Sequence, residues 1–296
     1  MAMGDLSASD EPVPLPFLQP FDGLGLLSFL ARRAVPGVEH VDVGSATYRR
    51  TFRIPSGTGS LEVRYIEGLA HLTLSGCPDV LPGLVERCRR LFDLDLVPSE
   101  VAAVLGADPV LAPLVAATPG LRVPGAWDGF ELAVRAVLGQ QVSVAAARTL
   151  LGRLTALVGR TAPSACAEAG LDLLFPTAEE VAVADLERLG VPASRRRTLR
   201  ALAEAVAAGR LTLEPGADPV ETRGRLLELP GIGPWTAAYV ALRALGDGDS
   251  LLVGDLALAK AAVRCGLPGT WPELVARAER WRPWRGYASL WLWTAV

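Results

Sequence analysis

The sequence predicts an α+β protein in which an N-terminal antiparallel sheet with helices is followed by a mostly α-helical core of two lobes. Two observations predict this fold class. Apolar and polar residues alternate in short runs between residues 39 and 75, as in strands that bury one face. Beyond residue 95, apolar residues recur at helical spacing between prolines and glycines, without a convincing alternating run. With 296 residues, 50% of them hydrophobic, the chain can bury a large core.

The first unit is expected to span residues 1–95. Its elements, in order, are a short helix over 21–34, strands over 39–44, 46–54, 60–66 and 69–75, and a helix over 78–92. Glycine-containing turns at 56–59 and 67–68 separate the later strands. The simplest arrangement of these four strands is an antiparallel meander.

The rest of the chain divides into three helical parts. Residues 96–125 are expected to pack with the C-terminal lobe, residues 126–245 to form a helical domain, and residues 246–296 to form the C-terminal helical lobe. The apolar spacing predicts helices over 98–105, 109–116, 126–158 with a break near Gly139, 177–189, 192–208, 219–229, 234–245, 255–265, 271–281 and 284–293. Short connections between them suit a compact unit.

Composition excludes several classes of function. The uncharged stretch at 109–121 contains three prolines and is shorter than the roughly 18 residues of a membrane-spanning helix. The first residues lack the pattern of a secretory signal, so we expect a cytoplasmic protein with no membrane partner. His40 and His71 are the two histidines, which argues against a Ser–His or multi-histidine site. Any acid–base chemistry therefore falls to carboxylates.

The cysteines and the charges give weaker information. The spacing of the four cysteines matches neither a zinc site nor an iron–sulfur run, so we expect buried reduced thiols at Cys77, Cys88, Cys166 and Cys265. The net charge of −3 argues mildly against nucleic acid. It hides a gradient, however, because residues 1–120 carry 9 basic and 14 acidic side chains, whereas residues 121–296 carry 20 and 18. The second part is the better candidate for contact with phosphate.

The most informative segment is the Leu-Pro-Gly-Ile-Gly run at 229–233, which lies between two predicted helices. Gly231 and Gly233 allow positive φ and leave the backbone uncovered, while Ile232 is suited to anchor the turn in the core. Pro234 suits the first turn of the next helix. Successive N–H groups at a helix N-terminus can bind a phosphate oxygen without net positive charge. A plain turn between packed helices is the alternative interpretation.

An acidic residue follows this hairpin after a polar turn. Asp255 stands where the apolar run 252–253 and Gly254 meet a new predicted helix. Capping alone would explain it, because aspartate is a preferred N-cap. The glycine hairpin, the spacing and the neighbouring glycine occur together, however, and favour a functional carboxylate.

This combination resembles the helix-hairpin-helix DNA glycosylases, and most of all their 3-methyladenine DNA glycosylase II (AlkA-like) branch. The resemblance extends over nearly the whole chain. The segments that carry it are 20–22, 27–34, 91–94, 120–125, 134–145, which includes Gly139-Gln140-Gln141-Val142-Ser143, 175–177, 278–285 and 287–288.

The resemblance implies a reaction and assigns roles. It implies a monofunctional DNA repair enzyme that flips an alkylated purine, such as 3-methyladenine or 7-methylguanine, out of double-stranded DNA and hydrolyses its N-glycosidic bond. Asp255 would stabilise the oxocarbenium-like sugar. Trp235, Tyr239 and Trp293 match positions that line the base pocket. Core packing is the alternative for Tyr239 and Trp293, and we expect Trp281, Trp284 and Trp291 to be packing residues.

Further roles follow from the same resemblance. Trp235 stands where bifunctional relatives carry a Schiff-base lysine, and the sole lysine, Lys260, lies on the following helix, so we expect hydrolysis without strand cleavage. Gln141, with Gln140 beside it, matches the side chain that fills the gap left by the flipped base; alternatively, the pair bridges a helix break. Arg282 and Arg285 are candidate phosphate contacts, or simply solvated side chains.

No cofactor is required by this interpretation. The cysteines do not form the iron–sulfur loop of some relatives, so no iron–sulfur cluster is expected. By analogy, the carbonyl groups of Leu229 and Ile232 are candidate ligands of a monovalent cation at the hairpin. We expect a monomer. Two other hypotheses stay open: a non-catalytic DNA-binding protein with the same hairpin, which predicts that Asp255 is only a cap, and a glycosylase for neutral damaged or mismatched bases.

Overall fold

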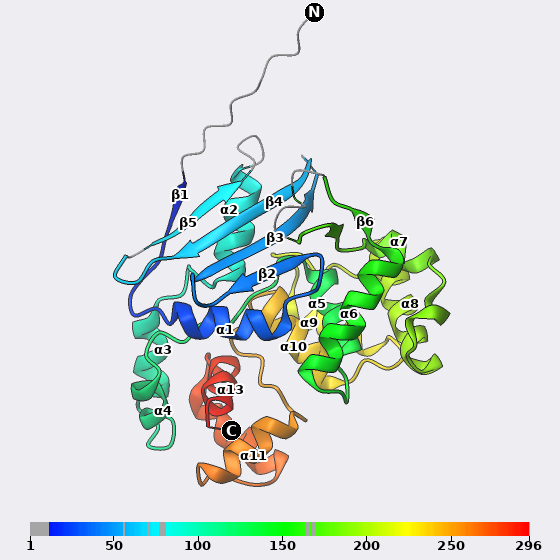
Figure 1. The fold of residues 1–296 in the computed structure, drawn as a ribbon. Coiled ribbons are helices and arrows are strands. Elements are labelled where there is room, and N and C mark those ends of the chain that lie inside the picture. The colour runs from blue at the N-terminus through cyan, green and yellow to red at the C-terminus, as the bar shows by residue number, and fades with distance from the viewer. Residues whose placement is uncertain are drawn as a thin grey trace, which may run out of the picture.

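The N-terminal part of the protein is a five-stranded antiparallel sheet, in the order β1-β5-β4-β3-β2 (Figure 1). A computed structural model describes residues 12–55, 57–69, 71–76, 81–163, 166 and 170–295. The strands are β1 (Val13–Pro16), β2 (Glu39–Asp42), β3 (Thr47–Ile54), β4 (Gly57–Tyr65) and β5 (His71–Gly76). The four strands expected from the alternating pattern are thus confirmed as a meander.

Strand β1 was not expected from the sequence. It pairs with β5, with Leu15 opposite Leu72, and both leucines are buried. Pro14 and Pro16 obscure the strand pattern, since proline lacks the N–H that an interior strand needs. An edge position tolerates them, because a strand there pairs on one side alone.

Two helices complete this part. Helix α1 (Gly23–Arg33) begins at Asp22, whose side chain accepts a hydrogen bond from the Gly25 N–H at 2.9 Å, and α2 is Leu81–Leu91. Leu27 and Leu30 of α1 lie in one hydrophobic core with residues of the sheet. In Figure 1, α1 runs between the sheet and the helices of the C-terminal part.

The helical part confirms the fold class predicted from the sequence. Figure 1 shows α6, α7 and α8 grouped on one side of the molecule, and α11 and α13 grouped below α1. The helices are α3 (Pro98–Leu105), α4 (Ala112–Ala117), α5 (Gly129–Leu138), α6 (Val144–Val158), α7 (Ala178–Val183), α8 (Ala193–Ala207), α9 (Pro219–Leu227), α10 (Pro234–Ala244), α11 (Leu256–Arg264), α12 (Trp271–Ala278) and α13 (Arg285–Trp293), with 3-10 turns η3 (Leu186–Leu189) and η4 (Glu279–Trp281).

The expected break near Gly139 is confirmed, since it separates α5 from α6. The expected helix over 177–189 is wrong as one element. It divides into α7 and η3, because the Asp185 side chain accepts from the Glu187 N–H and starts a new turn. A two-stranded ladder, β6 (Arg160–Thr161) with β7 (Leu173–Leu174), also contradicts the expectation of no strand beyond residue 95. Two residues are too few to show an alternating pattern.

A buried charge network joins the sheet to the helical part. Glu131 on α5 accepts from Arg50 of β3 at 2.9 Å, and Arg135 donates to Glu39 of β2 at 2.6 Å. Arg50 is 2% exposed and its guanidinium lies 4.5 Å from the ring centroid of Trp127. These buried charges therefore compensate one another across the contact between the two parts.

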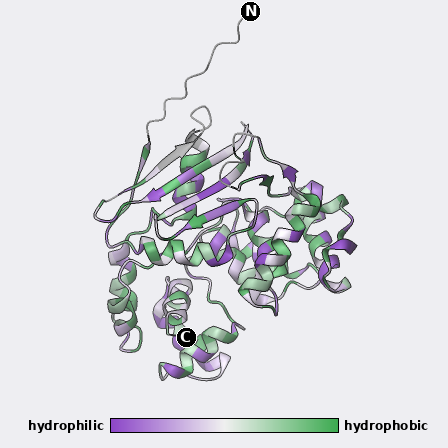
Figure 2. Cartoon of the chain, viewed as in Figure 1, coloured by the Kyte–Doolittle hydropathy of each residue, from purple (hydrophilic) through white to green (hydrophobic). Residues whose placement is uncertain are grey.

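Hydropathy follows the packing. Figure 2 shows hydrophilic and hydrophobic residues side by side along β3 and β4. Buried residues alternate along β4, as expected of a strand with one buried face, whereas β3 is buried on both faces, with Arg50 and Thr51 buried as well as Phe52. Cys88 and Cys166 are buried free thiols and Cys265 is half-buried, while Cys77 lies outside the described residues. Among the helices that the structure describes, none combines the length and the hydrophobicity needed to cross a bilayer.

Candidate active site

A cleft of about 1240 Å³ lies where the N-terminal part meets the helical part. Its walls come from α1, α5, α6, α10, the segment before α11 and the end of α13. The cleft brings together the glycine hairpin, both glutamines of the α5–α6 turn, Asp255 and the aromatic residues proposed from the sequence. Residues far apart in the chain thus share one space.

The hairpin between α9 and α10 has the shape expected of a backbone-exposing turn. Gly231 has φ +80°, and a Cβ there would lie 2.2 Å from the Thr198 hydroxyl oxygen. Ile232 is buried, as expected of an anchor. Gly233 has φ −102°, so the expectation of positive φ is wrong there; any residue can adopt this backbone. Within the described part of the chain, the N–H groups of both glycines have no hydrogen-bond partner.

The contacts of Asp255 are compatible with both roles that the sequence left open, a helix cap and a functional carboxylate. As the N-cap of α11, it accepts a hydrogen bond from the Leu258 N–H at 2.7 Å. Its carboxylate also accepts from two indole N–H groups, those of Trp235 at 2.9 Å and Trp293 at 3.2 Å. All three partners donate, so the group is fixed in orientation as an acceptor. A helix cap alone would not need the two tryptophans.

The aromatic wall stands on α10. The rings of Trp235 and Tyr239 stack with centroids 5.1 Å apart and planes 16° from parallel. Tyr239 is 9% exposed, so it is part of the core as well as of the cleft wall. Arg243, one turn further along α10, donates to the Tyr239 hydroxyl, and its guanidinium lies over the Tyr239 ring. Trp235, Tyr239 and Arg243 therefore follow one another at i, i+4 and i+8 on one face of the helix.

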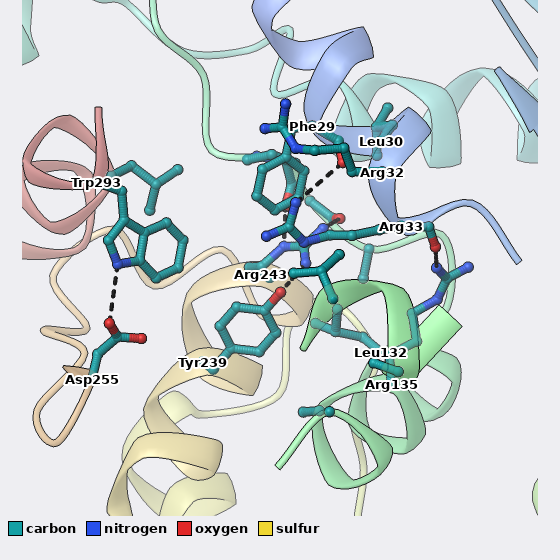
Figure 3. A pocket seen from close by; sticks show the side chains of 18 of the residues that line it. Phe29, Leu30, Arg32, Arg33, Leu132, Arg135, Tyr239, Arg243, Asp255 and Trp293 are labelled. Carbon is teal, nitrogen blue, oxygen red and sulfur yellow. Dashed lines mark hydrogen bonds between the residues drawn. The ribbon is translucent and has the colours of Figure 1, made fainter. Parts of the chain in front are cut away.

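Helix α1 supplies residues that the sequence analysis missed. Phe29 and Arg33, four residues apart on one face, line the cleft opposite Asp255 and Trp293 (Figure 3). The Arg33 guanidinium lies 3.7 Å from the centroid of the Phe29 ring. Burial lowers the pKa of Arg33 to about 10, and the positive charge of Arg243 adds to this effect. The sequence signal that could have identified these two residues is an aromatic and a basic residue four positions apart on one face of a short helix.

The two glutamines have different surroundings. Gln140 donates from Nε2 to the Gly231 carbonyl at 3.0 Å and to the Thr236 hydroxyl at 3.1 Å, so it bridges the α5–α6 break to the hairpin. Gln141 is exposed at the cleft and has φ +55°, an uncommon backbone for a residue with a side chain. Of the two glutamines, Gln141 is therefore the one whose side chain can extend away from the protein toward a ligand.

Arg282 and Arg285 lie outside the residues that line the cleft. Both contact the Asp249 carboxylate, and both also pair with Glu279. Lys260 is exposed on α11 and does not line the cleft either. Of the three tryptophans expected to pack, Trp281 and Trp291 are buried and Trp284 packs edge-on to Tyr287 with centroids 5.3 Å apart.

The carbonyl groups proposed as cation ligands lie on the hairpin. The Leu229 oxygen accepts from the Ile232 N–H at 3.2 Å and keeps a second lone pair. The Ile232 oxygen accepts no hydrogen bond from the residues that the structure describes. Side chains of His, Cys, Asp and Glu form no metal-binding group of three in that same part of the chain.

Fold and site together define a helix-hairpin-helix protein with an aromatic cleft that holds one fixed carboxylate. Comparison with known families agrees: the AlkA N-terminal domain matches residues 12–128, and the HhH-GPD superfamily of base excision DNA repair proteins matches residues 134–285. The chain belongs to this superfamily.

Relatives and solved structures extend this finding. The chain is 38% identical to Escherichia coli DNA-3-methyladenine glycosylase 2 over 93% of its own length and 94% of that protein. It is 43% identical to a probable bifunctional transcriptional activator/DNA repair enzyme AlkA of Mycobacterium tuberculosis, over 98% of this chain and 58% of that one. The chain therefore spans little more than half the length of the latter relative. The 3-methyladenine DNA glycosylase structure from Archaeoglobus fulgidus shares the fold, with a TM-score of 0.80 at 19% identity, covering 95% of this chain and 97% of the other.

Proposed function

We propose that the chain is a DNA glycosylase that flips alkylated purines out of double-stranded DNA and hydrolyses their N-glycosidic bond. The observation that carries this proposal is the Asp255 carboxylate, oriented by the Trp235 and Trp293 indoles inside a cleft large enough for a purine nucleoside. Relatives named DNA-3-methyladenine glycosylase support the choice of substrate class.

The chemistry asks little of the leaving group. A purine methylated at N3 or N7 carries positive charge and departs as a neutral base when its bond to C1′ breaks. The deoxyribose then develops oxocarbenium character, and a fixed carboxylate stabilises that charge where water is scarce. Asp255 is in place before the substrate arrives, so it pays no reorganisation cost during the reaction. A water molecule then attacks C1′ and completes the hydrolysis.

The aromatic wall is suited to a cationic ring. The faces of indole and phenol rings attract cations, and flat surfaces replace the stacking that the base loses when it leaves the duplex. Trp235 and Tyr239 present such surfaces beside Asp255, with Phe29 across the cleft. The extruded base therefore meets stacking partners and the sugar meets the carboxylate.

The hairpin and the glutamine turn are suited to DNA. The N–H groups of Gly231 and Gly233 and the start of α10 can hold a phosphate, which fixes the strand next to the cleft. Gln141 is exposed at the cleft, where it can occupy the gap left by the base, while Gln140 ties the α5–α6 turn to the hairpin. Arg282 and Arg285 remain proposed phosphate contacts, although both already form ion pairs with Asp249 and Glu279, which compensate part of their positive charge.

We infer hydrolysis without a lyase step, acting as a monomer. Trp235 cannot form a Schiff base, and the exposed Lys260 lies outside the cleft. A monovalent cation bound by the Leu229 and Ile232 carbonyls would stiffen the hairpin and add positive charge next to the phosphate.

The experiment compares the wild type with Asp255→Asn on duplex DNA treated with dimethyl sulfate. Asparagine keeps the shape and the N-cap but removes the charge, so we expect release of methylated purines to fall by about 100-fold or more. Asp218→Asn is the matched control, because Asp218 caps α9 in the same way and lies outside the cleft. Strands should break only after later alkali treatment. Equal release by Asp255→Asn and the wild type would refute the proposal.

A further inference from the structure

Arg33 is a cleft residue whose hydrogen-bonding capacity is largely unused. Within the described residues, the Arg33 side chain makes one hydrogen bond, from Nη1 to the Phe29 carbonyl at 3.3 Å. No carboxylate of those residues lies within 4.0 Å of its guanidinium. A guanidinium has five N–H groups and accepts nothing, so most of its donors face the cleft without a protein partner.

Neighbouring arginines differ in this respect. Arg135 uses all three nitrogens, on Glu131, Glu39 and the Arg33 carbonyl. Arg243 also uses all three, on the Tyr239 hydroxyl and the carbonyl groups of residues 124 and 125. These two arginines are committed to the fold. Arg33 is therefore the better candidate for contact with a ligand.

The backbone beneath Arg33 is held firmly. Arg135 donates to the Arg33 carbonyl at 3.0 Å, and Arg148 donates to the Ala34 carbonyl at 2.8 Å. Both bonds satisfy carbonyl groups at the C-terminal end of α1, which the helix itself leaves unpaired. The Phe29 ring supports the guanidinium from one side at 3.7 Å. Figure 3 shows the side chain reaching between Phe29 and Tyr239, toward the side of the cleft that holds Asp255 and Trp293.

We propose that Arg33 determines base specificity by donating hydrogen bonds to the keto oxygen of an extruded purine, and so favours methylated guanine over methylated adenine. This inference rests on the proposed glycosylase function. Guanine carries the O6 acceptor at the position where adenine carries an amino donor. Because the arginine side chain can only donate, it can form a hydrogen bond with guanine O6 but not with the adenine amino group, which is also a donor.

Charge repulsion between Arg33 and the methylated base affects both lesions alike, so it does not alter the ratio in which the two bases are released. 3-Methyladenine and 7-methylguanine nucleosides both carry one positive charge, so the repulsion from Arg33 applies to both substrates. The ratio of the two released bases therefore isolates hydrogen bonding from electrostatics. Burial of the guanidinium makes an unmatched donor costly, which increases the discrimination.

The test uses one substrate, duplex DNA treated with dimethyl sulfate, which contains both lesions. Released 3-methyladenine and 7-methylguanine are separated by chromatography, and kcat/KM is measured for each with the wild type, Arg33→Gln and Arg33→Lys. We expect Arg33→Gln to lower the 7-methylguanine to 3-methyladenine ratio by about 10-fold, the effect of losing a good base contact. Arg33→Lys keeps the charge but loses the planar fork, and is expected to lie between the two.

Arg32→Gln is the matched control, since Arg32 is the exposed neighbour on the same helix and also lines the cleft. It removes the same charge and should leave the ratio within about two-fold of the wild type, because charge alone acts on both lesions alike. Thermal unfolding of each variant checks that the fold is kept.

Outcomes separate the two proposals. A wild type that releases both bases, with a ratio unchanged in Arg33→Gln and Arg33→Lys, overturns the role of Arg33 and leaves the glycosylase function standing. A wild type that releases 3-methyladenine but no 7-methylguanine also overturns it. Release of neither base by the wild type overturns the glycosylase function, and the role of Arg33 with it.

Discussion

Replacing Glu131 by glutamine tests whether the buried charge network holds the N-terminal sheet against the helical core. Glu131 is 4% exposed and lies between the guanidinium groups of Arg50 and Arg135. Glutamine keeps the size of the side chain but removes its charge. Arg50, which is 2% exposed, would then lose its 2.9 Å ion pair and retain at most a distant one, 3.9 Å from Glu39.

The magnitude follows from burial. Removing one partner of a buried ion pair leaves an uncompensated charge and costs about 3–5 kcal/mol of stability. Burial by itself would raise the pKa of Glu131, but Arg50 and Arg135 lower it to about 2 from an ordinary value of 4.5. A depressed carboxyl pKa contributes stability above the ordinary value and loses it as the pH falls toward the depressed one. The free energy of unfolding of the wild type should therefore exceed that of Glu131→Gln by its largest amount above pH 4.5. This difference should become smaller as the pH falls from 4.5 to 2.

The assay is urea unfolding at pH 7, repeated at lower pH. Glu221→Gln is the matched control, because Glu221 and Arg225 form an i, i+4 pair like that of Glu131 and Arg135 but are exposed. We expect that control to cost about 0–1 kcal/mol. If Glu131→Gln costs no more than the control at pH 7, the argument that buried charge compensation joins the two parts is refuted.

Two further predictions concern the site. Trp293→Phe keeps an aromatic ring but removes one donor to Asp255, so kcat on methylated DNA should fall about 10-fold. Trp291→Phe, which loses a bond of the same 3.2 Å length to the Thr118 carbonyl, should leave kcat unchanged; equal kcat in the two variants would contradict the positioning role. Gly231→Ala forces φ +80° on alanine and a Cβ against Thr198, so affinity for duplex DNA measured by fluorescence anisotropy should fall about 10-fold. Gly224→Ala, in the open on α9, is the control, and wild-type affinity in Gly231→Ala would show that the hairpin does not bind phosphate.

Local features of the site could be read from the sequence because they depend on neighbouring residues. The Leu-Pro-Gly-Ile-Gly run defines a turn through its own backbone preferences, and Ile232 is buried as expected. The break near Gly139 and the cap at Asp255 depend in the same way on residues within one helical turn. Trp235 and Tyr239 share a face because they are four residues apart on one helix.

What the sequence by itself determined is therefore the fold class, the family, the helix cap at Asp255 and the turn at the glycine hairpin. The tertiary structure alone decided which distant groups meet them. Trp293 reaches Asp255 because α13 packs on α11, and Arg33 enters the cleft because α5 and α6 hold the end of α1. Arg282 and Arg285 both pair with Asp249, which is more than 30 residues away in the chain, so the sequence did not predict this partner. Both also pair with Glu279. The physical reason is that long-range pairing depends on how whole elements pack, whereas turns and caps depend on the chain within a few residues.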